Sequence, residues 1–314
     1  MKSVWVIGAN GLLGSALCAV LCGQGARLYV PSERLDWSNP ERLHAQLEAD
    51  VAEFAGYSTA AACWEIYWAA GIGTMASTED ALTRETDTLE FFLALLGRED
   101  RISKAAGSVS FASSAGAIYA GVEHGIISET TAVAPTTAYA HAKLKQEATV
   151  SAFAATQASV RVLIARFSTL YGVGQASGKQ QGLLTHIARN IVRNEPVHIY
   201  VPFDTIRDYI SVGDAAARMV SATRGMQDKQ LTKIIAAERP TTVAQVVSIF
   251  KRMARRRPRI VTSANQQSKL YKHRIEFRSN VAIGGVDIAL SSLEVGMAKL
   301  LEAERERYSR AMQR

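Results

Sequence analysis

The beginning of the chain combines an apolar run, three glycines and a helix pattern, in that order. Residues 4–7 are all apolar, as in a strand that is buried on both faces of a parallel sheet. Gly8, Gly11 and Gly14 follow at once, and apolar residues then recur at helical spacing over residues 12–21. This order predicts a strand, a tight turn and a helix that lies close to the strand.

A dinucleotide needs this arrangement. A glycine at the first position permits the tight turn, the second lets the backbone approach a pyrophosphate, and the third lets the helix pack on the strand. The amides at the helix start would then face the phosphates. We therefore predict dinucleotide binding rather than a purely structural turn. The candidate cofactor-binding residues of this segment are Gly8, Asn10, Gly11, Leu12, Leu13 and Gly14.

Length and composition fit an ordinary globular enzyme. A chain of 314 residues can bury a substantial core and is expected to hold one large or two intimate domains. The N-terminus reaches a strand within three residues, which leaves no room for a secretory signal, and no apolar run reaches membrane-spanning length. We expect a cytoplasmic protein with no membrane partner.

Cysteine, histidine and charge point to no further chemistry. Three cysteines cannot all pair, and Cys18 and Cys22, one helical turn apart, fit small apolar packing better than half a metal site. The six histidines lack ligand spacing, so no metal is expected. The net charge of +7 gathers partly in a basic run, which fits a solvated helix face better than a nucleic-acid site because no aromatics interleave. This run contains Lys251, Arg252, Arg255, Arg256, Arg257 and Arg259.

The second predicted strand, residues 26–30, bears on the choice of cofactor. An acid at its end would bind a ribose hydroxyl, whereas serine or arginine would accommodate a 2′-phosphate. Ser32 and Arg34 lean toward NADP, while Glu33 between them leaves NAD open. Asp36 stands shortly before a predicted helix start, where an acid commonly caps the helix.

Two further segments continue the alternation of strand and helix. Residues 64–68 are mostly apolar and predict a buried strand, which ends in the small residues Ala69, Ala70 and Gly71, where a backbone can pass close to a ligand. Residues 79–96 form an amphipathic helix pattern whose apolar face could cover the sheet.

A tyrosine and a lysine carry the predicted chemistry. Tyr139 and Lys143 are one helical turn apart, so both side chains emerge on the same face. A lysine there can lower the pKa of the phenol from its ordinary value near 10 toward one that is useful at neutral pH. The strand predicted at 109–112 runs into Ser113 and Ser114, which precede this helix.

Together these motifs resemble the NAD(P)-dependent epimerase/dehydratase family of extended short-chain dehydrogenases/reductases over about residues 1–220. The resemblance implies an α/β fold, a doubly wound parallel Rossmann sheet with a smaller C-terminal α/β substrate-binding lobe. The cofactor domain would span residues 1–165, with 205–236 returning to it, and the lobe 166–204 and 237–314. The cofactor would be NAD or NADP, and Ala69, Ala70, Gly71 and Asp36 would contact its ribose and adenine.

The family pattern also assigns catalytic roles and shows one departure. Tyr139 would be the acid and base, with Lys143 beside it. A hydroxyl usually stands four residues before the tyrosine matched by Tyr119, and this position is Ala115. We take Ser114 first and Ser113 second as its substitute, the alternative being that both are turn residues. An Asp-Glu pair is missing after this position, which argues against a 4,6-dehydratase.

Substrate residues follow from two later motifs. Residues 166–172 resemble a segment in which an asparagine contacts the sugar diphosphate, and Thr169 stands at that position. Residues 205–214 resemble a segment whose arginine, here Arg207, binds the diphosphate, as suits a planar cation with paired donors. Asp208 and Asp214 are expected to hydrogen-bond the loop and to cap the next helix.

The resemblance implies a nucleotide-sugar substrate. It also implies a homodimer, because the long helix that corresponds to residues 79–96 often forms the dimer interface in such enzymes. The first hypothesis is a nucleotide-sugar epimerase that oxidises a sugar carbon, usually C4, and returns the hydride to the other face, in polysaccharide or glycosylated-metabolite synthesis. The second is an NADPH-dependent ketoreductase of a nucleotide-linked keto sugar. A non-catalytic cofactor-binding regulatory protein and a nucleic-acid binder are less favoured alternatives.

Overall fold

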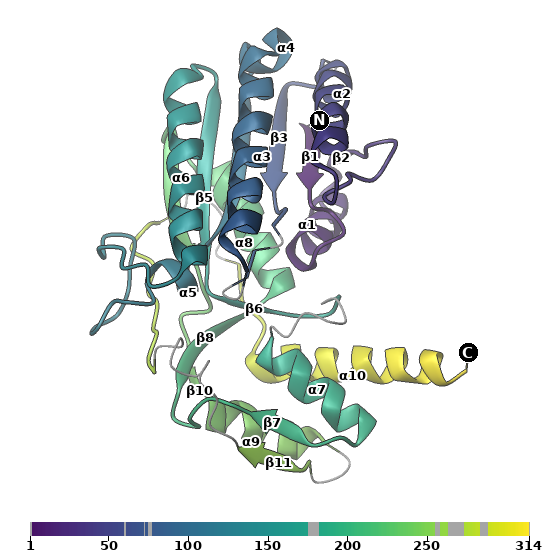
Figure 1. The fold of residues 1–314 in the computed structure, drawn as a ribbon, viewed down its shortest axis with the longest axis vertical. Coiled ribbons are helices and arrows are strands. Elements are labelled where there is room, and N and C mark those ends of the chain that lie inside the picture. The colour runs from purple at the N-terminus through teal and green to yellow at the C-terminus, as the bar shows by residue number, and fades with distance from the viewer. Residues whose placement is uncertain are drawn as a thin grey trace.

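A six-stranded sheet forms the centre of the larger part of the molecule (Figure 1). The structure is a computed structural model that describes residues 2–59, 61–71, 73–74, 77–174, 182–254, 258–262, 273–282 and 288–313. All neighbouring strands of this sheet are parallel, and their order is β2-β1-β3-β4-β5-β9. The strands are β1 (Lys2–Ile7), β2 (Arg27–Tyr29), β3 (Cys63–Trp68), β4 (Gly107–Ser114), β5 (Val160–Phe167) and β9 (Gln230–Ile235).

Helices cover both faces of the sheet, which confirms the predicted doubly wound α/β class. One face carries α2 (Pro40–Ser58), α3 (Glu79–Arg98), the short α4 (Asp100–Ser103) and α6 (Ala138–Thr156), and the other carries α1 (Leu12–Gly23) and α8 (Val212–Gly225). Trp5 and Ile7 pack under the first group, whereas Val4 and Val6 pack under the second. Successive strand residues face opposite helix layers, which is why the run is apolar throughout.

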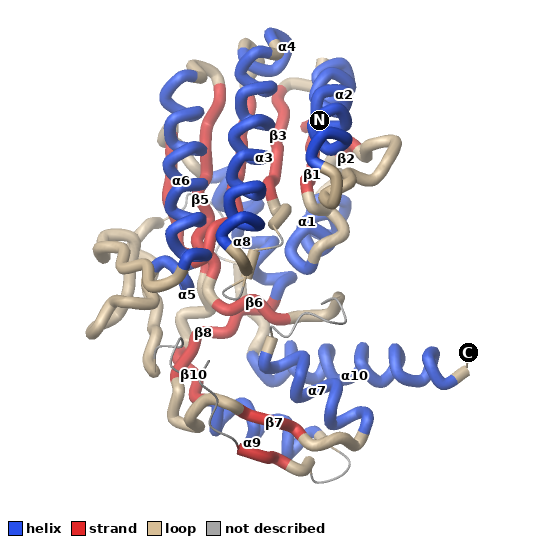
Figure 2. The backbone as a smooth tube through the Cα atoms, in the orientation of Figure 1, coloured by secondary structure: helices blue, strands red, loops and turns tan. Residues whose placement is uncertain are grey.

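A smaller lobe lies beyond the carboxyl ends of the sheet strands (Figure 2). It contains a three-stranded sheet of order β10-β8-β6 and the pair β11-β7. Its helices α7 and α10 pack together, and their apolar side chains share one core with α9. Its elements are β6 (Thr169–Tyr171), α7 (Leu183–Arg193), β7 (Val197–Ile199), β8 (Ile206–Ser211), β10 (Pro240–Thr242), α9 (Val243–Met253), β11 (Ile260–Thr262) and α10 (Leu293–Met312).

Some element ends differ from the predictions because local capping decides them. The sequence pattern of residues 286–310 predicts a charged terminal helix, but residues 288–292 are loop and Ser292 caps α10 by accepting from the amide of Val295. The sequence pattern after residues 38–40 predicts a helix to about residue 62, whereas α2 ends at Ser58. Within the basic run, Lys251 and Arg252 lie in the last turn of α9, and Arg255, Arg256 and Arg257 lie outside the described residues.

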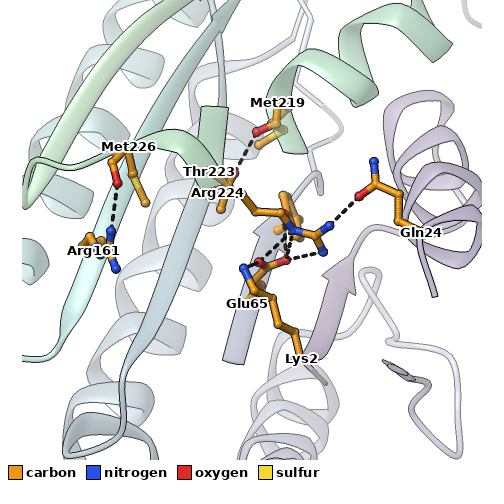
Figure 3. A network of polar contacts seen from close by, with 10 residues as sticks. Lys2, Gln24, Glu65, Arg161, Met219, Thr223, Arg224 and Met226 are labelled. Atoms are coloured by element: carbon orange, nitrogen blue, oxygen red, sulfur yellow. Dashed lines mark hydrogen bonds and ion pairs between the residues drawn. The ribbon is translucent and has the colours of Figure 1, made fainter. Parts of the chain in front are cut away.

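A buried carboxylate joins three elements at the amino end of the sheet (Figure 3). Glu65 of β3, with a side chain only 3% exposed, accepts from Lys2 Nζ of β1 at 2.7 Å and from Arg224 Nε of α8 at 3.0 Å. Arg224 also donates to Gln24, just after α1. Burial alone would raise the pKa of Glu65, but Arg224 and Lys2 more than offset it and hold the pKa below its ordinary value.

Candidate active site

The glycines after β1 are required by backbone contacts. Gly8 has a φ of +86°, and a Cβ there would lie 2.6 Å from the backbone nitrogen of Ala70. A Cβ at Gly14 would lie 2.0 Å from the carbonyl oxygen of Gly8, so only glycine lets α1 pack on the turn. Gly11 closes the turn by donating its amide to Gly8 at 2.9 Å.

The start of α1 is open toward the carboxyl edge of the sheet. Gly11 is its N-cap residue and supplies no side-chain acceptor, so the first-turn amides around Leu12 and Leu13 keep their capacity to bind an anion. Asn10 beside them is exposed. These features fit the pyrophosphate of a dinucleotide.

The segment after β2 offers exposed polar groups. Ser32 and Arg34 are exposed, whereas the carboxylate of Glu33 accepts from Arg42 of α2 at 3.2 Å. Glu33 is therefore drawn toward α2, and the strand end itself presents no acid.

Asp36 serves the start of α2. Its Oδ1 accepts from the amide of Ser38 at 3.1 Å and from its hydroxyl at 2.5 Å, and Asn39 next to it caps the helix. The hydrogen bond from the Ser38 hydroxyl is the main cause that holds the pKa of Asp36 below its ordinary value. The local geometry thus gives Asp36 a structural role at the helix start, and the adenine contact stays a prediction.

The small residues after β3 lie against the glycine turn. The amide of Ala69 donates to Ile7 at 2.9 Å, and the backbone of Ala69 and Ala70 fills the space that a Cβ at Gly8 would need. Gly71 follows, beside the carboxylate of Glu85. The two predicted cofactor-binding turns therefore meet at one place on the sheet edge.

Tyr139 and Lys143 lie in the first two turns of α6, which Thr137 caps by accepting from the amide of Ala140. The Lys143 Nζ lies 5.8 Å from the centroid of the Tyr139 ring and 5.2 Å from that of Phe111 on β4. Tyr139 is half-buried and Lys143 is 5% exposed. The two side chains thus share one face of the helix, as their spacing predicts.

A buried glutamate that the motifs did not identify contacts this pair. Glu85 of α3 accepts from Lys143 Nζ at 3.1 Å and from the amide of Gly73 at 2.9 Å. Burial alone would raise the pKa of Glu85, but Lys143 and the hydrogen bonds more than offset it and lower the pKa. The signal in the sequence was an acid within the apolar stripe formed by Leu82 and Leu89.

The two serines at the end of β4 differ. The Ser113 hydroxyl donates to Glu147 Oε1 at 2.6 Å, and Glu147 pairs with Arg166, which also donates to Tyr119. Ser113 is therefore engaged in a buried network. Ser114, the last residue of the strand, makes no side-chain hydrogen bond with any other described residue.

The position that usually bears the hydroxyl is closed. Ala115 is fully buried in an apolar cluster with Ile118, Ile234 and Phe277. Strand alternation turns Ser114 to the face opposite Ser113 and Phe111. Of the two predicted substitutes, the structure leaves only the Ser114 hydroxyl without a hydrogen bond to another described residue.

The predicted substrate residues lie in the sheet β10-β8-β6. Thr169 opposes Tyr209 in the register of β6 and β8, and Arg207 of β8 donates to the carbonyl of Ile206 at 2.8 Å. Asp208 accepts from the amides of Ala237 and Arg239 at 2.8 and 2.9 Å, as expected of a scaffold residue. Both Thr169 and Arg207 are half-buried.

The prediction that Asp214 caps the next helix, α8, is wrong. Ser211 caps α8 by accepting from the amide of Asp214 at 3.2 Å, because its hydroxyl stands one residue before the first helical residue. The carboxylate of Asp214 instead accepts from the amide and hydroxyl of Ser291, just before α10. Asp214 thus links α8 to the segment just before α10 of the lobe.

Within the residues that the structure describes, no three His, Cys, Asp or Glu side chains gather in a way that could hold a metal ion. None of the described helices has both the length and the apolar character that a membrane-spanning helix needs.

Comparison with known proteins agrees with this geometry. The model of the NAD dependent epimerase/dehydratase family matches residues 4–236. No curated protein sequence matches the chain.

Three similar solved structures cover nearly the whole chain. MoeE5 in complex with UDP-glucose and NAD is 22% identical, with a TM-score of 0.76 over 98% of this chain and 99% of that one. UDP-glucose 4-epimerase from Thermotoga maritima with UDP-glucose is 19% identical, with a TM-score of 0.75 over 98% and 100%. RMD from Pseudomonas aeruginosa complexed with NADPH is 17% identical, with a TM-score of 0.77 over 98% and 100%. These likenesses show the shared fold.

Proposed function

The chain belongs to the NAD dependent epimerase/dehydratase family, and from this we propose that it is a nucleotide-sugar epimerase that acts by transient oxidation of a sugar carbon. The observation that carries the proposal is the half-buried Tyr139 ring beside buried Lys143, at the same sheet edge as the glycine turn. Solved structures of this fold hold UDP-glucose with NAD, which supports a nucleotide-sugar substrate and this cofactor class.

The residues at the sheet edge fit a nicotinamide dinucleotide. The open first turn of α1 would bind the pyrophosphate, and the turn at Ala69, Ala70 and Gly71 would pass close to a ribose, since no long side chain stands there. Ser32 and Arg34 would face the adenosine ribose or its phosphate. When bound, the dinucleotide supplies hydride acceptance and return.

The chain's own residues hold the substrate and move the proton. Tyr139 takes the proton of the sugar hydroxyl during oxidation and gives it back after the ketone has turned. Ser114 stays the candidate that would hydrogen-bond the reacting oxygen, because Ser113 is held by Glu147. Arg207 and Thr169 bind the diphosphate from the lobe, whose segments 166–204 and 237–314 shape the pocket. The expected C4 position follows from the family resemblance.

The end of β2 favours a second candidate, an NADPH-dependent ketoreductase of a nucleotide-linked keto sugar. Its end bears no acid, Glu33 is drawn to Arg42, and Arg34 is exposed where a 2′-phosphate would lie. RMD, a structure of similar fold, is complexed with NADPH.

One experiment separates the two candidates. The purified protein is denatured, any released nicotinamide is identified, and the stripped protein is titrated with NAD⁺ and NADPH. An epimerase recovers its own hydride in every cycle, so tightly held NAD⁺ that copurifies supports the first proposal. Freely exchanging NADPH supports the reductase. Binding of neither would refute both.

A further inference from the structure

A small cavity lies at the amino end of the central sheet, at the opposite end from the candidate active site. Its volume is about 80 Å³, far below the roughly 300 Å³ of a small drug-sized ligand pocket, so it admits only a small group. Charged and hydroxyl-bearing side chains of β1, β3, β4, β5 and α8 line the cavity. They are Lys2, Glu65, Ser108, Arg161, Thr223 and Arg224.

The register of the sheet brings three of these side chains into one row. Ser108 of β4 is paired with Glu65 of β3 on one side and with Arg161 of β5 on the other. Side chains at paired positions of a parallel sheet point to the same face. Ser110, two residues on from Ser108 and thus on the same face, contacts the hydroxyl of Thr223 at 2.7 Å. The row therefore faces the last turn of α8.

The cavity carries more positive than negative charge. Among the described residues that line it, Lys2, Arg161 and Arg224 are cations, and Glu65 is the one anion. The carboxylate of Glu65 accepts from both Lys2 and Arg224, at 2.7 and 3.0 Å. One negative charge is thus shared between two of the cations, while the third has no acidic partner among these side chains. An excess of positive charge in a partly enclosed space favours a bound anion.

The cavity also holds hydrogen-bond donors that the protein leaves unused. Ser108 is only 8% exposed, yet its hydroxyl makes no hydrogen bond with any other described residue. A buried hydroxyl without a partner costs free energy, which an acceptor in the cavity would recover. Within the described part of the chain, Arg161 makes one hydrogen bond, from Nη1 to the carbonyl of Met226 at 2.8 Å (Figure 3). Since a guanidinium has five N–H donors, most of them remain available.

We propose that this cavity is a binding site for a doubly charged, phosphate-type oxyanion, separate from the candidate active site. The oxyanion accepts from the hydroxyl of Ser108 and from the guanidinium of Arg161, and it balances the excess positive charge of the cavity. Because Arg161 also holds the carbonyl of Met226, just after α8, the bound ion strengthens the attachment of this helix to the sheet. The inference does not depend on the proposed function.

Calorimetric titration of the whole chain with inorganic phosphate tests the site, at an ionic strength held constant with chloride. The wild type gives a saturable heat with millimolar phosphate, and phosphate raises the thermal unfolding midpoint because it binds the folded state. Arg161→Gln weakens the affinity for phosphate by about 10- to 100-fold, as expected for the loss of a charge-assisted hydrogen bond. The absence of saturable binding in the wild type would overturn the proposal.

Ser108→Ala removes one hydroxyl and little else. The unfolding midpoint in chloride stays at the wild-type value, because the hydroxyl has no hydrogen bond within the described residues to lose. Phosphate affinity falls by about tenfold. Wild-type affinity in this variant would contradict the assigned contact.

Two control variants locate the bound ion. Arg98→Gln removes an exposed charge in the last turn of α3, outside the cavity lining, and keeps the wild-type affinity. An equal loss in Arg98→Gln and Arg161→Gln would mean a general effect of net charge and would refute the site. Arg207→Gln removes the arginine proposed to bind a diphosphate at the candidate active site. Phosphate binding that is lost in Arg207→Gln but kept in Arg161→Gln would overturn the proposal.

Methyl phosphate distinguishes two sources of the oxyanion. Because the side chain of Arg161 is exposed, the cavity opens to solvent, and the rest of a phosphate ester could extend outward. Equal affinity for methyl phosphate and inorganic phosphate supports the phosphate group of a larger ligand. A clear preference for inorganic phosphate supports the free ion.

Discussion

At the scale of single residues, the hydroxyl of Tyr139 is the first target. Tyr139→Phe removes the proton donor and acceptor but keeps the ring, so kcat/KM falls by about 10²–10⁴ while the glycine turn and its cofactor contacts remain. Steady-state kinetics measures the loss, and intrinsic tryptophan fluorescence measures cofactor binding. Loss of both would assign Tyr139 to binding rather than to proton transfer.

Gly14 gives a second prediction at this scale. In Gly14→Ala the new methyl would lie 2.0 Å from the carbonyl oxygen of Gly8, so α1 must shift and stability falls by about 1–3 kcal/mol, together with cofactor affinity. Urea unfolding and a dinucleotide titration report the two effects. Gly23→Ala, in the last turn of the same helix with open space around it, gains up to about 1 kcal/mol.

The residues that the sequence identified are those whose neighbours along the chain define their role. Gly8, Gly14, Tyr139 and Lys143 stand in short motifs with fixed spacing, and the structure brings them to one sheet edge. Glu85 was missed because its partner Lys143 is distant in sequence, and such a contact depends on how α3 packs on α6. Helical spacing alone predicts only which face a side chain occupies.

At the scale of elements, the packing of α2 on β2 buries an acid. Asp50 of α2 is 6% exposed, Tyr29 donates to its Oδ1 at 3.4 Å, and its Oδ2 has no hydrogen-bond partner among the described residues. Burial is the main cause that raises the pKa of Asp50 to about 6. Ionisation of Asp50 in the folded state therefore works against folding.

The sign of the resulting pH dependence follows directly. A raised folded pKa means that the penalty is complete above about pH 6 and is lost as the pH falls toward 4. Asp50→Asn should therefore stabilise the protein by about 1–2 kcal/mol at pH 7.5, after screening by nearby solvent, and by little at pH 4. Urea unfolding at the two pH values measures this. Glu48→Gln, exposed on the same helix, should change neither value.

The strands could be predicted better than the ends of the helices. The apolar residues of β1, β3 and β5 pack on both faces of the sheet, so the largely apolar composition of these segments marks them as buried strands. The start of a helix depends on one hydrogen bond, such as the one that Ser211 accepts from the amide of Asp214 or that Ser292 accepts from the amide of Val295. Several nearby polar residues could also have accepted such a bond.

At the scale of the whole molecule, an expected homodimer built on α3 would have to form through polar outer surfaces. The apolar side of α3 already covers the sheet through Leu89, Phe92 and Leu93. The outer sides of α3 and α6, which lie side by side (Figure 1), carry exposed charges such as Asp87 and Lys145. A dimer built here would therefore rest on complementary charges and on small outer side chains of α6.

Light scattering after size exclusion tests the dimer. We expect a mass about twice that of the chain at low salt, with a shift toward the monomer as salt rises, because screening weakens charge pairs at the surface. Asp87→Lys should reduce the dimer fraction, and Asp228→Lys, exposed just before β9, should not. A monomer at all concentrations would contradict the expectation.

The two parts of the molecule were not equally predictable. The Rossmann half consists of repeated strand and helix units, each of which carries its own periodicity. Most strands of the lobe, such as β7, β10 and β11, have only three residues, and the lobe is held together by contacts between distant segments. Patterns this short carry little information, so the shape of the substrate pocket, and with it the sugar, could not be read from the sequence.

The late position of β9 in the chain determines how long the edge of β5 stays unpaired during synthesis. β9 completes the sheet beside β5, but residues 168–229 separate the two strands. At about 5–20 residues per second, the ribosome leaves the hydrogen-bonding edge of β5 unpaired for about 3–12 s before β9 has been made. An unpaired, apolar strand edge readily joins another chain. Production of this protein in cells should therefore depend on chaperone supply and improve when translation of the intervening segment is fast.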